Sequence, residues 1–150
     1  MKFERLSNNE LRSLEKEFVQ FLVVNGIVAA DWEKIKKEDA EKAEKLIELF
    51  SDKIWEKSLE KINYLEHRTP NSIKVFYCKK DMIELIGVDA DHQGFIDKEI
   101  VIDPQKKYSL IEYKKKYHPD RETELFKMIK SGCYISSEKN FNLLKSLNDS

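Results

Sequence analysis

The sequence predicts an α+β fold, in which helices precede and follow a small antiparallel sheet built on one central hairpin. Ile73, Val75 and Tyr77 alternate with other side chains at the start of residues 73–88, and a second β-prone run begins at Met82 after three polar residues. Segments with a helical spacing of apolar residues lie on both sides of this stretch. An isolated hairpin is only marginally stable in water, so this one must pack on helices or further strands. Because Phe76 and Cys78 make its second face partly apolar too, we expect both faces to be at least partly covered.

The first helix is the best specified element. Ser7 and Glu10 have the spacing of a capping box, and Gly26 supplies a stop. Additional valines widen its apolar stripe, so we expect this helix to be buried on more than one side. The stripe consists of Leu11, Leu14, Phe18, Phe21 and Leu22, widened by Val19, Val23 and Val24.

Two further helices are predicted before the hairpin. Asp31 or a neighbour begins a short helix that runs through Glu38, and Asp39 caps a longer one, which could restart near Ser51. Trp32 lies among charged residues, and it is either an exposed anchor for a partner or part of the core of the first helix. We favour the core interpretation and keep the anchor as the alternative.

Additional strands are predicted on either side of the hairpin. Residues 64–69 form a lead-in strand before Pro70, and residues 100–102 add a strand that ends before Pro104. The apolar residues of 106–117 fit a helix face and a strand alternation equally well, so both assignments stay open.

Two helices are predicted to close the chain. Asp120 caps the first, and Gly132 ends it. Ser136 or Ser137 begins the last helix, whose apolar stripe is Phe141, Leu144 and Leu147.

Composition limits the classes of function. The 150 residues predict one domain spanning 1–150, and the net charge of −1 argues against DNA binding or any whole-surface binding to nucleic acid. Cys78 and Cys133 lie in apolar patterns, so we expect reduced, buried thiols in a cytoplasmic protein. The apolar stretch 18–30 is interrupted by polar residues and is too short for a membrane span, and the first residues do not resemble a signal peptide.

One stretch partly resembles a calcium-binding loop. Asp89, Asp91 and Asp97 occupy loop positions 1, 3 and 9 of an EF-hand, and Gly94 occupies position 6. Position 12 is Ile100, so the bidentate glutamate of that loop is missing. We therefore expect a polar loop and no bound metal or other cofactor, with cation binding as the weaker alternative.

A second stretch contains a motif-like tripeptide. His118, Pro119 and Asp120 resemble the His-Pro-Asp signature of J-domain co-chaperones, which implies a turn between two helices and a site for an Hsp70-type chaperone. The structural alternative is a turn at Pro119 and a helix capped by Asp120, and we favour it. The residues before the tripeptide that would share a partner-binding surface with it are Lys114, Lys115, Lys116 and Tyr117.

The same region is the best candidate for binding RNA. Between Lys106 and Arg121, lysines alternate with Tyr108, Tyr113 and Tyr117. Basic charge beside aromatic rings suits an RNA backbone with stacked bases, and it also suits an acidic protein surface.

The pair His67 and Arg68 is the remaining candidate. These residues could bind an anion or, with His92, form a hidden hydrolytic site. No nucleophile or metal ligand lies near the pair in sequence, and the usual catalytic signatures are missing.

Six stretches spread over most of the chain carry a resemblance to known sequences: 14–26, 30–35, 48–54, 64–70, 73–76 and 121–129. Through them the whole chain resembles a family of small bacterial proteins defined only as a domain of unknown function. The resemblance implies a cytoplasmic protein and carries over no activity, ligand or catalytic residue. We therefore expect a non-enzymatic cytoplasmic protein that binds another protein, with a co-chaperone or an RNA-binding protein as alternatives.

Overall fold

The computed structural model describes residues 1–149 of the chain. Contacts between residues divide it into two compact units, Met1–Ser58 and Leu59–Ser150. The predicted α+β class is confirmed, because helices lie at both ends of the chain and an antiparallel sheet lies in the middle. The single domain expected over residues 1–150 stays a prediction.

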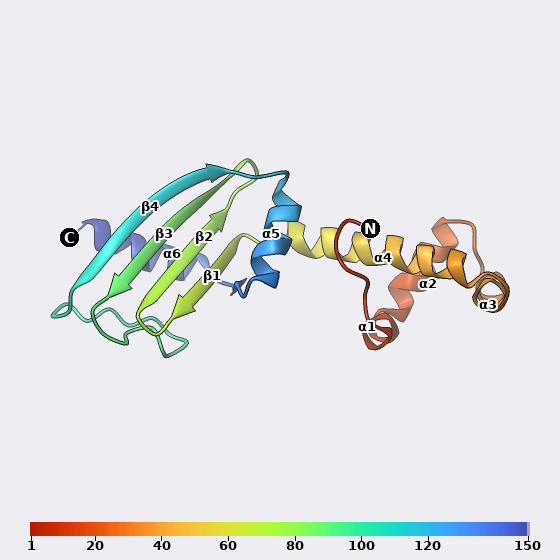
Figure 1. Ribbon diagram of the computed structural model, residues 1–150, viewed down its shortest axis with the longest axis horizontal. Coiled ribbons are helices and arrows are strands. Elements are labelled where there is room, and N and C mark those ends of the chain that lie inside the picture. The colour runs from red at the N-terminus through yellow and green to blue at the C-terminus, as the bar shows by residue number, and fades with distance from the viewer. Residues whose placement is uncertain (150) are drawn as a thin grey trace. The chain divides into compact units, whose positions relative to one another are not determined.

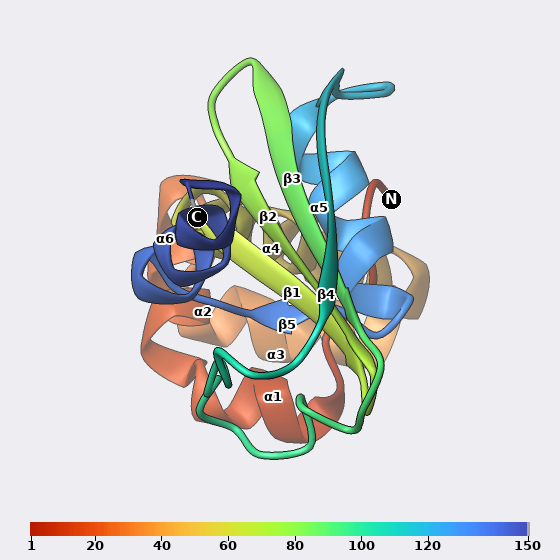
Figure 2. The same cartoon turned by 90° about the vertical axis from the view of Figure 1, so that its left-hand side faces the viewer.

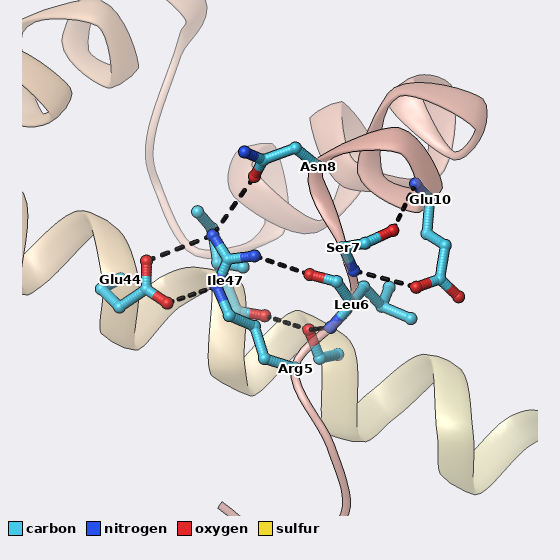
Figure 3. A network of polar contacts seen from close by, with 8 residues as sticks. Arg5, Leu6, Ser7, Asn8, Glu10, Glu44 and Ile47 are labelled. Carbon is cyan, nitrogen blue, oxygen red and sulfur yellow. Dashed lines mark hydrogen bonds and ion pairs between the residues drawn. The ribbon is translucent and has the colours of Figure 1, made fainter.

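The first unit is helical. It contains α1 (Asn8–Ser13), α2 (Glu15–Val24), α3 (Ala29–Glu38) and α4 (Ala40–Glu60) up to Ser58 (Figure 1). The first predicted helix is divided at Leu14, which ends α1. The predicted capping box is present, since Ser7 Oγ accepts from Glu10 N and Glu10 Oε1 accepts from Ser7 N (Figure 3).

The predicted starts of the remaining helices of this unit are only partly confirmed. Asp39 Oδ1 accepts from Lys42 N at 3.1 Å, so the predicted cap of α4 is confirmed. The predicted restart at Ser51 does not occur, since α4 continues through this residue, whose Oγ donates to Ile47 O at 2.7 Å. No side chain caps α3, and Asp31 lies in its first turn.

Aromatic rings fill the centre of the helical unit. Trp32 is half-buried and meets the Phe18 ring edge-on at a centroid distance of 5.2 Å, which favours its assignment to the core. The expectation that α2 is buried on more than one side is wrong. Val19, Val23 and Val24 are 48%, 57% and 85% exposed, because only the stripe of α2 that contains Leu22 packs against the buried residues Ile27 and Leu46.

The second unit contains the sheet. Its strands are β1 (Tyr64–Thr69), β2 (Ser72–Cys78), β3 (Met82–Ala90), β4 (Tyr108–Lys116) and β5 (Tyr134–Ile135), in the antiparallel order β4-β3-β2-β1-β5 (Figure 1). The hairpin and the lead-in strand are confirmed, and residues 106–117 are mostly a strand. Residues 100–102 are not a strand, since Ile100 is buried in the core from an irregular segment.

Helices α5 (Arg121–Lys130) and α6 (Glu138–Ser146) lie on opposite faces of the sheet (Figure 2), and a 3₁₀ turn, Leu147–Asp149, follows α6. Asp120 caps α5 and Ser137 caps α6, as predicted. Gly132 follows α5 with φ +111°, a conformation that favours glycine. Both faces of the hairpin carry buried residues, as expected. The core on the α6 face contains Ile73, Val75, Ile86, Val88, Phe95, Ile100, Phe141 and Leu144, and Leu65, Cys78, Ile83 and Leu125 are buried elsewhere in this unit.

None of the described helices is both long enough and apolar enough to cross a membrane.

Candidate functional site

The candidate site is an open cleft of about 1080 Å³ at the end of the sheet where β1 and β5 lie. Three segments that are distant in sequence form it: β1, the irregular segment at residues 95–99, and the chain from β5 to the first turn of α6. It is lined by Glu66, Arg68, Thr69, Pro70, Phe95, Ile96, Lys98, Glu99, Tyr134, Ile135, Ser136, Ser137, Lys139 and Asn140.

Glu66 lies at the base of the cleft and is only 2% exposed. Its Oε1 accepts hydrogen bonds from Ser136 Oγ at 2.7 Å and from Asn140 Nδ2 at 3.1 Å. Its Oε2 accepts one from Arg68 Nε. This buried carboxylate is therefore held by donors from β1, from the end of β5 and from α6.

The environment of Glu66 determines its charge. Burial acts to raise the pKa of Glu66, but the hydrogen bonds from Arg68, Ser136 and Asn140 and the charge of Arg68 outweigh burial, so the pKa is lowered. Burial and the negative charge of Glu66 raise the pKa of the Tyr134 phenol beside it. Glu66 is therefore ionised at neutral pH and accepts hydrogen bonds, so it has no proton to donate as a general acid.

Arg68 connects the base of the cleft to its wall. Its Nη1 and Nη2 donate to the carbonyl oxygens of Asp97 and Lys98 at 2.7 and 2.8 Å. The guanidinium is thus used to hold residues 95–99 beside β1. His67 is exposed and, as the neighbouring residue of a strand, faces the other side of the sheet. The structure therefore separates the pair that was predicted to bind an anion.

The rim of the cleft is apolar. Ile96, Tyr134 and Ile135 are 64%, 49% and 70% exposed. Lys98, Glu99 and Lys139 add charges of both signs around them. Sequence reasoning missed this site, although a glutamate in the middle of the predicted strand 64–69 was a signal that the strand needs polar partners.

The His-Pro-Asp tripeptide has a structural role at the junction of β4 and α5. Asp120 Oδ1 accepts from Thr123 N at 2.9 Å, and His118 N donates to Glu124 Oε1 at 2.8 Å. His118 and Pro119 are exposed. Residues 82–90 and 108–116 are strands, which contradicts the helices that the J-domain resemblance implies.

The tyrosines of the basic stretch before the tripeptide do not lie together on one surface. Tyr117 OH donates to Lys79 O at 2.6 Å, and burial raises the pKa of Tyr117 to about 12. Tyr108 OH accepts from Asp103 N at 2.9 Å, whereas Tyr113 is 58% exposed. The three tyrosines predicted to stack RNA bases therefore lie in three different environments.

The lysines of this stretch lie at the end of β4, and two of them form ion pairs. Lys114 Nζ lies 3.6 Å from Glu84 Oε1, and Lys115 pairs with Glu124. Lys116 is exposed.

The aspartates of the calcium-like stretch do not converge. Asp89 belongs to β3, and Asp91 pairs with His92 at 3.0 Å. Asp97 contributes its carbonyl oxygen to Arg68. Within residues 1–149, no group of acidic, histidine or cysteine side chains has the arrangement of a metal site. Neither His67 nor His92 lines the cleft, so the hypothetical hydrolytic set is not assembled there.

Comparison with known proteins assigns the chain to a family. Neither the curated proteins nor the solved structures include a match to this chain. A family model described as "Family of unknown function (DUF6495)" matches residues 1–149. This match confirms the resemblance to a family of unknown function that the sequence indicated, and the chain belongs to the DUF6495 family.

Proposed function

We propose that this protein is a non-enzymatic, cytoplasmic, bacterial interaction protein that binds an extended segment of a partner protein in the cleft beside β5. One observation carries the proposal: three exposed apolar side chains, Ile96, Tyr134 and Ile135, surround a polar base whose groups already bind one another. Exposed apolar groups gathered at a cleft are typical of surfaces that bind other proteins.

The polar groups of the cleft favour binding over catalysis. Ser136 Oγ donates to Glu66, and Ser137 Oγ accepts from Asn140 N at 3.1 Å as the cap of α6. A serine nucleophile requires a neighbouring base that takes its proton, whereas Glu66 has a lowered pKa and is a weak base. The Ser136 hydroxyl thus links the end of β5 to β1, and the Ser137 hydroxyl caps α6.

The position of β5 favours an extended partner. β5 is the last strand in the sheet order, so its outer edge can hydrogen-bond to the backbone of an added chain. Ile135 and Ile96 would then contact apolar side chains of that chain, while the charges of Lys98 and Glu99 would bind its polar groups.

The thiols support the proposed compartment. Cys78 and Cys133 are both free, and burial raises the pKa of Cys78 to about 12, so this thiol stays protonated and unreactive. Free cysteines are typical of proteins from reducing compartments.

The test compares two substitutions at equally exposed apolar positions. Ile135→Asp places a charge on the rim, and Val101→Asp places the same charge at a residue that is 68% exposed and does not line the cleft. Tagged wild-type and variant proteins are used to capture partners from lysates with and without ribonuclease treatment, and captured proteins are quantified by mass spectrometry. We expect a stoichiometric partner that is lost with Ile135→Asp and retained with Val101→Asp.

Two outcomes would contradict this proposal. Equal capture by both variants would place the partner elsewhere on the protein. Capture that ribonuclease abolishes in the wild type would indicate an RNA-dependent association instead.

A further inference from the structure

The outermost strand, β4, is exposed along its second half. β3 lies on one side of β4, and no strand lies on the other side among residues 1–149. The residues from Ile111 to Lys116 are all exposed, although Lys115 pairs with Glu124 of α5. A nine-residue edge strand offers a row of backbone N–H and C=O groups to which another chain can bind.

The charges on β4 restrict which chain can bind there. Lysines on an edge strand oppose pairing with most other strands. Glu112 lies two positions before Lys114, so both side chains project from the same face. Glu112 is exposed and has no hydrogen bond or ion pair among the described residues. When two copies of β4 lie antiparallel, Glu112 of one copy can therefore face Lys114 of the other, and Lys114 of the first can face Glu112 of the second.

We infer that β4 pairs with β4 of a second copy of this chain, antiparallel and with the two-fold axis at Tyr113. In this register Glu112 of each copy lies directly opposite Lys114 of the other, and the two Tyr113 side chains lie opposite each other. Such an interface uses the same surface of both copies, as two-fold dimers do. It joins the two sheets into one continuous sheet and removes both exposed edges.

Neighbouring registers are less favourable. An axis at Glu112 or at Lys114 places that residue opposite its own copy, and like charges directly opposite destabilise a strand pair. An axis at Ile111 leaves Glu112 opposite Leu110, without an ion pair. The axis at Tyr113 is therefore the register among these four that forms opposite-charge pairs and no like-charge pair.

Side chains on both faces gain contacts in the Tyr113 register. Lys114 already lies 3.6 Å from Glu84 on β3, so the pairing creates a row of alternating charge from Glu84 through Lys114 to Glu112 of the second copy. On the other face, Ile111, which is 54% exposed, lies opposite the aliphatic part of Lys115 of the second copy.

A charge exchange tests this inference. The masses of the wild type, Glu112→Lys, Lys114→Glu and the double variant are measured by light scattering across a concentration series. We expect a dimer for the wild type, weaker dimers for the single variants, with the dissociation constant raised about tenfold or more, and recovery in the double variant. Lys107→Glu, at an exposed lysine outside β4, controls for net charge and leaves the dimer unchanged.

Repeating the light scattering in salt provides a second measurement. Because 1 M salt screens exposed charge pairs, it should reduce the difference in dissociation constant between the single variants and the wild type. A wild type that is monomeric at every concentration would overturn the inference. So would single variants that dimerise as tightly as the wild type, or a double variant as weak as the single ones. Circular dichroism of each variant confirms that the sheet is intact, which is expected because both residues are exposed.

Discussion

Replacing Glu66 with alanine tests whether the base of the cleft holds the second unit together. The substitution removes the acceptor of three hydrogen bonds, from Arg68, Ser136 and Asn140. It also leaves the Arg68 guanidinium, whose side chain is 9% exposed, without its carboxylate partner. Breaking a buried ion pair from one side typically costs about 3–5 kcal/mol, so we expect a loss of that size in the free energy of unfolding.

The measurement is urea unfolding followed by circular dichroism. Both tryptophans, Trp32 and Trp55, lie in the first unit, so tryptophan fluorescence would report on the wrong part of the chain. Glu99→Ala is the matched control. Its carboxylate lines the same cleft, is 79% exposed and lies 3.8 Å from Lys139, so its removal should change the free energy by less than about 0.5 kcal/mol. A loss below about 1 kcal/mol for Glu66→Ala would refute the reasoning, since it would mean that water replaces the carboxylate as the acceptor for all three donors.

Three further outcomes follow from the structure. Because the pKa of Glu66 is lowered in the folded protein, its contribution to stability is complete above pH 4.5, the value of a free glutamate, and is lost as the pH falls through the folded pKa. The free energies of unfolding of the wild type and of Glu66→Gln, measured across an acid titration, should therefore differ above pH 4.5 and converge below the folded pKa. Leu144→Ala should reduce the free energy of unfolding by about 2–5 kcal/mol in a urea experiment, because Leu144 is fully buried in the core on the α6 face. Gly132→Ala should lower the thermal midpoint and cost about 1 kcal/mol or more, because φ +111° strains any residue with a Cβ; an unchanged midpoint would show that the backbone relaxes there.

Features that depend on neighbouring residues could be predicted from the sequence. The hairpin alternation, the capping box at Ser7 and Glu10, and the helix caps at Asp39 and Asp120 all act over a few residues, and each is present in the structure. The strand β4 could not be assigned, because its apolar residues fit two periodicities and its pairing with β3 decides between them.

Features that depend on distant residues could not be predicted. Glu66 and its partner Asn140 are 74 positions apart, and the residues next to each of them do not indicate that the two side chains meet. The same limit explains the error at Val19 and Val23, since periodicity indicates which side of a helix is apolar but not whether another element covers it.

The guanidinium of Arg121 binds carbonyl oxygens at two places far before it in the chain, Leu59 O at 3.0 Å and Cys78 O at 3.2 Å. It thereby adds a second donor, beside Ile62 N, to the Leu59 carbonyl in the last turn of α4, from 62 positions downstream. During synthesis on the ribosome, we expect the end of α4 and the end of β2 to gain these hydrogen bonds only once Arg121 has left the exit tunnel. A nascent chain stalled before this residue should remain open to proteases at the end of α4, and one stalled well beyond it should be protected there.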